Sequence, residues 1–273
     1  MNLLLLPGLL CDEAAWAPVL PHLRGIAECR VAGYGDADSL AGMACRVLEG
    51  APAQFAIAGH SMGARVAMET YRMAPQRVVG LALLDTGWQP LPAGAAGAQE
   101  RDRRMALVER ARTEGMRAMG REWLRPMVHP ARLDDRPLVE AILAMVGRST
   151  PERFAGQVRA LIDRPDLTDL LRAVRVPTLV AYGREDAWSP VAQHEAIAAL
   201  VPRGRLAVFD DCGHMAPMER PAAVARVLVD WLRAAAAAGD PADPARRSVA
   251  STGGASSAFR VNQTFPMLEA PSA

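Results

Sequence analysis

Ser61, Asp186 and His214 have the residue types, and the order along the chain, of a serine nucleophile with its carboxylate and its base. Ser61 is the centre of residues 59–63, Gly-His-Ser-Met-Gly, a G-x-S-x-G sequence between a short apolar run and a pattern typical of a helix. A nucleophile elbow requires this context, because a sharp, strained turn exposes the serine hydroxyl. Side chains at Gly59 and Gly63 would collide with the neighbouring strand and helix. G-x-S-x-G alone is common by chance, and the simpler interpretation is an ordinary turn.

A serine hydroxyl needs an adjacent base, usually a histidine that a carboxylate orients. His214 is favoured because it follows an apolar run, 206–209, and precedes a helical pattern. His22 and His194 fall in amphipathic helices and are expected at the surface. His60 lies inside the elbow and cannot easily reach the hydroxyl of its neighbour. His129 is expected to be structural, with contact to substrate as the alternative.

The carboxylate is less sharply defined than the base. Asp186 follows the apolar run 176–182 and gives the order serine, aspartate, histidine, which is the order of the α/β hydrolases. Asp85 follows the run 78–84 and is a geometrically possible alternative. Asp210 and Asp211 are too close to His214 in sequence to face its ring. We therefore favour Asp186 and keep Asp85 open.

Two backbone N–H groups are candidates for an oxyanion hole. The helix after the elbow directs its N-terminus at the serine, so the amide of Met62 is one donor. The second is expected from the loop after the first strand, at Leu9 or Leu10, and Leu9 is favoured. The simpler interpretation is that Pro7 and Gly8 only end that strand.

The elements that position these residues alternate between strand and helix. Apolar runs predict strands at residues 3–6, 26–32, 55–58, 78–84, 176–182 and 206–209. Asp12 is expected to cap a helix that contains Trp16, and Ser39 is expected to cap a second helix. Ser189, followed by Pro190, is expected to cap a third helix that ends at Leu200. The alternation predicts an α/β fold with a doubly wound, mostly parallel sheet of about six strands.

Residues 89–169 contain helical patterns and no convincing strand. The predicted domains are therefore an α/β core of residues 1–88 and 170–238, an all-helical insertion of residues 89–169, and a tail of residues 239–273. The tail is rich in Pro, Ala, Ser, Gly and Arg and is expected to be disordered.

The composition of the 273-residue chain argues against several other classes of protein. The net charge is +1, with 31 basic residues, all arginine, and 30 acidic ones, so nucleic acid is not an expected partner. No apolar run is long enough to span a membrane, and the first ten residues lack the charges and cleavage site of a signal peptide. A cytoplasmic location is expected. The four cysteines show no C-x-x-C spacing, and no metal, phosphate or dinucleotide motif is present, so neither metal nor cofactor is predicted.

Four segments together resemble the α/β-hydrolase superfamily: Leu-Pro-Gly-Leu-Leu-Cys-Asp at 6–12, the elbow, Gly183 to Asp186, and Gly213-His214. The resemblance spans about residues 3–236 and is narrowest to small, capped, esterase-like members. It implies a Ser-His-Asp triad, a backbone oxyanion hole and a helical cap over the site. Two departures stand out: Pro-Gly replaces the usual His-Gly at 7–8, and the leading antiparallel strands are missing. The exposed edge of the sheet is expected to be covered by a partner subunit or by the tail.

The expected activity is that of a carboxylesterase-like enzyme, cleaving a small-molecule ester or thioester through an acyl-enzyme. Trp88 and four cap residues are candidates for the acyl pocket, with ordinary core packing as an equal alternative: Trp123, Met127, Met116 and Met119. Arg65, with the cap residues Arg121 and Arg125, raises the alternative of an anionic substrate. The default interpretation of Arg65 is a solvated or helix-capping side chain.

The alternatives with the same triad are C–C bond hydrolysis and a lyase reaction, since the menaquinone-pathway synthase branch has a similar Ser-x-Gly-x-Arg elbow. A remote alternative is a non-catalytic ligand-binding protein on the same fold. The protein is expected to be a monomer or a homodimer.

Overall fold

The computed structural model describes residues 1–239, and six parallel strands form the sheet on which this part of the chain is built. Their order in the sheet is β2-β1-β3-β4-β5-β6, and every neighbouring pair is parallel. The strands are β1 (Asn2–Leu6), β2 (Glu28–Val31), β3 (Phe55–His60), β4 (Val78–Leu84), β5 (Thr178–Gly183) and β6 (Gly204–Phe209). The predicted α/β class and the six-stranded sheet are confirmed. Within residues 1–239 the sheet has no antiparallel strand.

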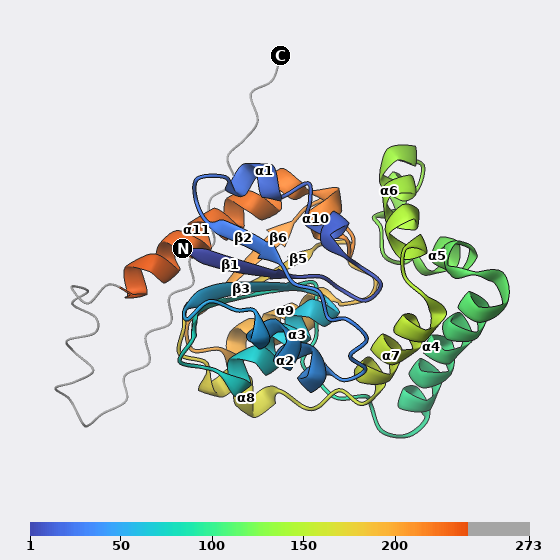
Figure 1. Cartoon of the computed structure of the whole chain (residues 1–273), viewed down its shortest axis with the longest axis horizontal. Helices are drawn as coiled ribbons and strands as arrows, with labels where there is room; N and C mark the ends of the chain where they lie inside the picture. Colours follow the sequence, from blue (N-terminus) through green and yellow to red (C-terminus); the bar gives the residue numbers. More distant parts are fainter. Residues whose placement is uncertain (240–273) are drawn as a thin grey trace, which may run out of the picture. The chain divides into compact units, whose positions relative to one another are not determined.

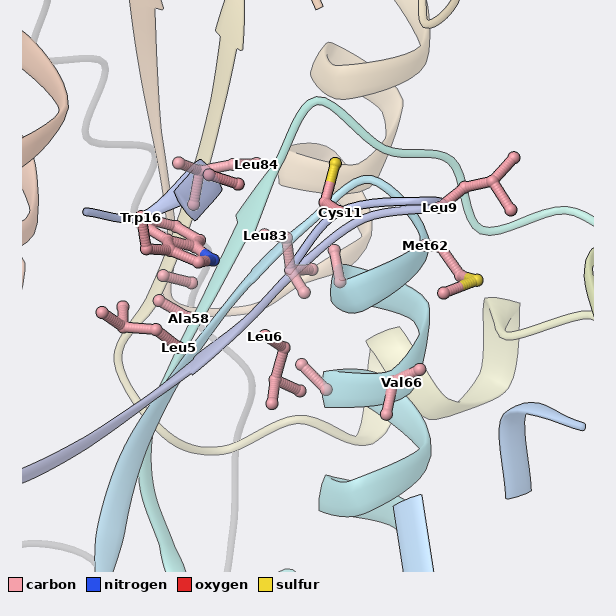
Figure 2. Packing of buried hydrophobic residues seen from close by; sticks show 14 of the residues in the cluster. Leu5, Leu6, Leu9, Cys11, Trp16, Ala58, Met62, Val66, Leu83 and Leu84 are labelled. Carbon is pink, nitrogen blue, oxygen red and sulfur yellow. The ribbon is translucent and has the colours of Figure 1, made fainter. Parts of the chain in front are cut away.

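The central strands are apolar along their whole length because helices cover both faces of the sheet. Figure 2 shows the consequence in β1. Leu5 lies on the side of Trp16, whereas Leu6 lies toward Val66 on the helix Met62–Met73, which follows β3. The side chains of Leu5, Leu6 and Trp16 are fully buried. Alternation of side chains along a strand therefore serves two cores rather than one core and solvent.

Helices flank the sheet on its two faces (Figure 1). On one face lie α2 (Leu40–Glu49), α3 (Met62–Met73) and α9 (Val191–Leu200), and on the other α1 (Leu20–Leu23) and α11 (Pro221–Gly239). Ser39 caps α2 as predicted, since its side chain accepts a hydrogen bond from the amide of Gly42.

One expected helix start is confirmed only in part, and another is wrong. Asp12 does cap a helical turn, but that turn is only the 3₁₀ segment η1 (Glu13–Ala15), and the chain turns again before α1 begins. The N-cap of α9 is Pro190 rather than Ser189. The amide of Ser189 donates instead to the carboxylate of Asp186 at 2.8 Å, because the loop is folded around that carboxylate.

Between β4 and β5 the chain is helical, as expected of the insertion (Figure 1). The segments are α4 (Gly94–Glu114), α5 (Met116–Trp123), η2 (Pro130–Arg132), α6 (Arg136–Gly147), α7 (Pro151–Ile162) and α8 (Thr168–Ala173). Thr150 caps α7, and Asp135 caps α6 with Pro137 in its first turn. The predicted boundary at residue 169 falls inside α8 (Thr168–Ala173), and the division into core and insertion stays a prediction. The predicted tail lies outside the described residues, apart from its first residue.

Candidate active site

Ser61, His214 and Asp186 form a continuous hydrogen-bonded chain. The Oγ atom of Ser61 lies 2.8 Å from Nε2 of His214, and Nδ1 of His214 lies 2.8 Å from Oδ2 of Asp186. Each residue follows the carboxyl end of a strand: β3, β6 and β5, respectively. In a parallel sheet these ends share one edge, which explains how residues 153 positions apart come together. The geometry suits a nucleophile, its base and the group that orients the base.

The backbone at Ser61 is strained in the way an elbow requires. Its φ of 56° and ψ of −118° lie in a region that side chains other than glycine rarely adopt. A Cβ atom at Gly59 would lie 2.3 Å from the carbonyl oxygen of Gly63, and one at Gly63 would lie 2.3 Å from that of Leu6. These contacts are far shorter than van der Waals distance. Both glycines are therefore needed for the close approach of α3 to β1 and β3.

Positive φ angles in residues other than glycine occur in four loops that follow strands. The residues are Leu10 after β1, Ser61 after β3, Asp85 after β4 and Asp211 after β6. Such conformations cost free energy and persist only where the surrounding structure enforces them. Backbone strain in residues 1–239 is thus concentrated at the sheet edge that carries the candidate site.

The structure distinguishes the two candidate carboxylates by their surroundings. Burial alone would raise the pKa of Asp186, but the neighbouring His214 and the amides of Ser189 and Trp188 lower it below its usual value. Burial, reinforced by the charge of Asp186, raises the pKa of Asp85 well above its usual value. Asp85 accepts a hydrogen bond from the amide of Gly183 at 2.8 Å and does not reach the ring of His214. The ionised carboxylate beside His214 is therefore Asp186.

The loop that carries His214 is held by a buried carboxylate that the sequence reasoning missed. Oε1 of Glu219 accepts the amides on either side of the histidine, Gly213 and Met215, both at 3.1 Å. Oε2 accepts the amide of His129, which belongs to the insertion, at 2.9 Å. Nothing in the sequence around Glu219, which lies between Met218 and Arg220, distinguished it from a surface residue. Glu219 therefore links the histidine loop to the insertion.

His60 is buried beside the same loop. Its Nε2 lies 2.6 Å from the carbonyl oxygen of His214 and 3.8 Å from Oδ2 of Asp85. Burial, followed by the proximity of His214, lowers the pKa of His60 from 6.5 to about 3. The neutral ring can donate its Nε2 proton to the carbonyl and does not compete with His214 as the base for Ser61.

The loop after β1 presents the expected backbone donors. The amide of Leu10 donates to Oε1 of Gln157 at 2.9 Å, and the hydroxyl of Tyr34 donates to the carbonyl of Pro7 at 2.8 Å. Neither the amide of Leu9 nor that of Met62 has an acceptor among residues 1–239. The alternative donor, Leu10, is thus already engaged, whereas Leu9 and Met62 remain available.

A small pocket with a cavity volume of about 20 Å³ opens over Ser61 and His214. Trp123 and Met127, two of the predicted lining residues, lie in its wall, together with four that the sequence reasoning missed: Cys11, Arg104, Leu161 and Trp188. Trp88 is not part of this wall, and its indole N–H donates to Oγ1 of Thr168 at 3.0 Å. Met116 and Met119 are buried among the insertion helices, which agrees with the packing alternative.

Two side chains expected in solvent are buried. Arg65 is only 7% exposed, and its Nη1 has no hydrogen-bond partner among residues 1–239. His194 is fully buried: Nε2 accepts the amide of Thr86 at 2.9 Å, and the ring stacks on Tyr182 at 4.6 Å. Both lie on helices that also carry exposed polar residues, such as Arg72 on α3 and Glu195 on α9, and both are covered by residues distant in the sequence. Local periodicity cannot reveal such partners. Arg121 and Arg125 are exposed and do not line the pocket.

Most of the α/β core and the whole insertion match a known family. The family model described as the alpha/beta hydrolase family matches residues 3–227. The chain belongs to that family. This α/β hydrolase is 30% identical over 248 residues to the pimeloyl-acyl-carrier-protein methyl ester esterase of Klebsiella pneumoniae strain 342, with 84% of this chain and 92% of the relative covered.

A second such esterase, from Aromatoleum aromaticum, is 26% identical over 85% of this chain and 98% of its own. Among solved structures, this α/β hydrolase resembles a malate-bound esterase from Thermogutta terrifontis. That match has a TM-score of 0.75 and 29% identity, and it covers 86% of this chain and 90% of the other. Family and relatives together identify the chain as an α/β-hydrolase enzyme.

Residues 1–239 contain neither a candidate membrane span nor a candidate metal site. No helix in this part of the chain is long and apolar enough to cross a membrane. In the same range, no group of three or more His, Cys, Asp or Glu side chains has an arrangement that could hold a metal ion.

Proposed function

We propose that the protein hydrolyses a small carboxylic ester or thioester through an acyl-enzyme, with Ser61 as nucleophile, His214 as general base and acid, and Asp186 as the orienting carboxylate. The observation that carries the proposal is the chain of two 2.8 Å contacts from Ser61 Oγ through His214 to Asp186, at the wall of a pocket. The relatives named as methyl ester esterases support the choice of substrate class.

In the first half-reaction, Ser61 Oγ attacks the acyl carbon while Nε2 of His214 takes the hydroxyl proton. Asp186 stabilises the imidazolium through Nδ1–H and keeps the ring in the productive tautomer. His214 then gives the proton to the leaving alkoxide or thiolate, and the C–O or C–S bond breaks. In the second half-reaction His214 takes a proton from a water molecule, which attacks the acyl carbon. The bond between that carbon and Ser61 Oγ then breaks, His214 returns the proton to Oγ, and the acid is released.

The negative charge that develops on the acyl oxygen is proposed to be stabilised by the amides of Leu9 and Met62. Neither amide has another acceptor among the described residues. Donors that are held in place before the reaction stabilise the transition state without reorganisation, by about 3 kcal/mol for each donor. Residues 89–169 are proposed as a cap that shapes the acyl pocket, since Trp123, Met127 and Arg104 reach the pocket wall from this segment.

The test is hydrolysis of p-nitrophenyl acetate, butyrate and octanoate by the wild type and by Ser61→Ala. We expect turnover by the wild type and loss of nearly all of it in the variant, with unchanged thermal stability. Thr113→Ala, which removes an exposed hydroxyl on α4, serves as the matched control and is expected to keep full activity. Equal hydrolysis by wild type and Ser61→Ala would refute the assignment of the nucleophile.

A second candidate function uses the same triad for C–C bond hydrolysis or a lyase reaction on an anionic substrate. It is favoured by the buried Arg65 on the elbow helix and by Arg104 in the pocket wall. Labelling of Ser61 by a fluorophosphonate without ester turnover would favour this candidate. The absence of both labelling and turnover would favour a non-catalytic ligand-binding protein.

A further inference from the structure

Two arginines, Arg104 and Arg164, share the carboxylate of Glu100 beside the pocket, and the charges of all three act on the buried Arg65. Together, Arg65, Glu100, Arg104 and Arg164 are termed the arginine cluster. Arg104 donates from Nε to Oε1 of Glu100 at 2.9 Å, and its Nη2 lies 2.9 Å from the same oxygen. Arg164 donates to Oε1 at 2.9 Å and to Oε2 at 3.0 Å. The charges of the other three members act on Arg65 through space and shift its pKa.

The cluster has more positive than negative charge. Three guanidinium groups and one carboxylate leave an excess of two positive charges in a region where Arg65 and Arg104 are each 7% exposed. Burial, followed by the charges of Arg164 and Arg104, lowers the pKa of Arg65 from 12.5 to about 9 in spite of the opposing charge of Glu100. Burying uncompensated charge is costly unless another group pairs with it. The cluster therefore favours an additional anion.

The three arginines differ in how many of their N–H donors are used. Arg164 uses four of its five, because in addition to its two bonds to Glu100 its Nε donates to the carbonyl of Gln89 and its Nη1 to that of Leu161. By contrast, Nη1 of Arg65 is buried without a partner, and Arg104 uses only Nε and Nη2 among the described residues.

Arg104 connects the cluster to the pocket. It lies in the pocket wall together with Ser61 and Leu9, and its guanidinium stacks on the ring of Trp188 at 5.2 Å. Stacking on one side and Glu100 on another fix the orientation of the guanidinium, so its free edge is held in place before any ligand arrives. Met127 and Leu161 are among the apolar residues of the same wall.

We propose that the ester cleaved at Ser61 carries a carboxylate, which Arg104 binds in the pocket with the support of the charge on Arg65. The inference rests on the proposed ester hydrolysis. A carboxylate fits because few donors are unused and because an apolar wall suits the hydrocarbon segment that joins the carboxylate to the ester. A planar guanidinium edge matches a two-oxygen acceptor of this kind.

The kinetic test compares kcat/KM for monomethyl succinate, adipate and suberate with that for the dimethyl esters of the same acids. A parallel series of O-acetyl hydroxy acids and the corresponding alkyl acetates places the carboxylate on the alcohol side. In at least one series we expect the carboxylate-bearing ester to be preferred about 10-fold or more. Arg104→Met should abolish the preference, and Arg104→Lys should retain part of it. Arg101→Met, an exposed arginine on the same helix, should leave the preference as it is.

Binding is measured separately in Ser61→Ala, which cannot turn over the ester. Monomethyl adipate should raise its melting temperature more than dimethyl adipate does, and adding Arg104→Met should remove the difference. Equal use of charged and neutral esters in both series would refute the carboxylate site while leaving ester hydrolysis intact. Stabilisation by sodium acetate or phosphate equal to that by monomethyl adipate would also refute it, in favour of a general anion site. If no ester is cleaved, the proposed function fails, and the binding measurement still tests the site.

Discussion

Replacing Glu219 with glutamine tests whether this carboxylate positions the candidate base. Glu219 is 3% exposed and accepts three backbone amides: Gly213 and Met215, which flank His214, and His129 of the insertion. Glutamine has nearly the same shape but offers one acceptor oxygen and one NH₂ group. With the oxygen toward Gly213 and Met215, the NH₂ group faces the amide of His129, and two donors oppose each other.

The magnitude follows from these contacts. A buried donor left without an acceptor costs about 1–3 kcal/mol, and a hydrogen bond to a charged group is about twice as strong as a neutral one. One lost and two weakened hydrogen bonds give an expected loss of about 3 kcal/mol in the free energy of unfolding. Because His214 is held between two of the amides, kcat should fall about 10- to 100-fold with a smaller change in KM.

Urea denaturation measures the stability, and the rates with the best p-nitrophenyl ester measure the effect on the reaction. Glu195→Gln makes the same chemical change at an exposed position of α9 and should alter neither quantity appreciably. If the free energy of unfolding of Glu219→Gln lies within about 0.5 kcal/mol of the wild-type value and the variant keeps the wild-type kcat, the three amides do not depend on the carboxylate. That result would refute the positioning argument.

Three further predictions follow from the contacts described above. Gly59→Ala places a Cβ atom 2.3 Å from a backbone oxygen and should abolish activity and lower the melting temperature. Gly147→Ala, at a position of α6 with open space around it, should be neutral or stabilising. Equal effects of the two changes would contradict the steric argument. Burial lowers the pKa of His194 from 6.5 to about 4, so stability present above pH 6.5 should be lost as the pH falls toward 4, by up to about 3 kcal/mol. Urea titrations at several pH values should show a flatter dependence in His194→Gln, and an unchanged slope would count against this residue. Gln157→Met removes the acceptor of a loop amide next to Leu9 and should lower both stability, by about 1 kcal/mol, and kcat, measured by urea denaturation and ester hydrolysis; an unaltered kcat would separate this contact from the oxyanion loop.

Much of the architecture could be predicted from local patterns. Apolar runs such as 3–6 and 78–84 identify strands because both faces of a parallel sheet are buried, so no alternation with polar residues is needed. The elbow could be recognised because G-x-S-x-G between a strand and a helix is a local steric requirement, and the spacing of Gly59 and Gly63 proved to be a matter of backbone contact. The rule that the carboxyl ends of parallel strands share one edge of the sheet then pointed to Asp186 and His214 as the partners of Ser61.

Tertiary structure decided which polar side chains are buried and what they contact. His194 and Arg65 lie on helices whose periodicity predicted exposure, yet their surroundings come from segments such as Thr86, 108 residues away from His194. Likewise, nothing in the sequence near Arg104 or Glu219 indicated that one would reach the pocket wall and the other would bridge the insertion and the histidine loop. The physical reason is the range of the interactions. Strand, turn and cap preferences arise within a few residues, whereas the desolvation and pairing of a buried charge depend on atoms that only the folded chain brings together.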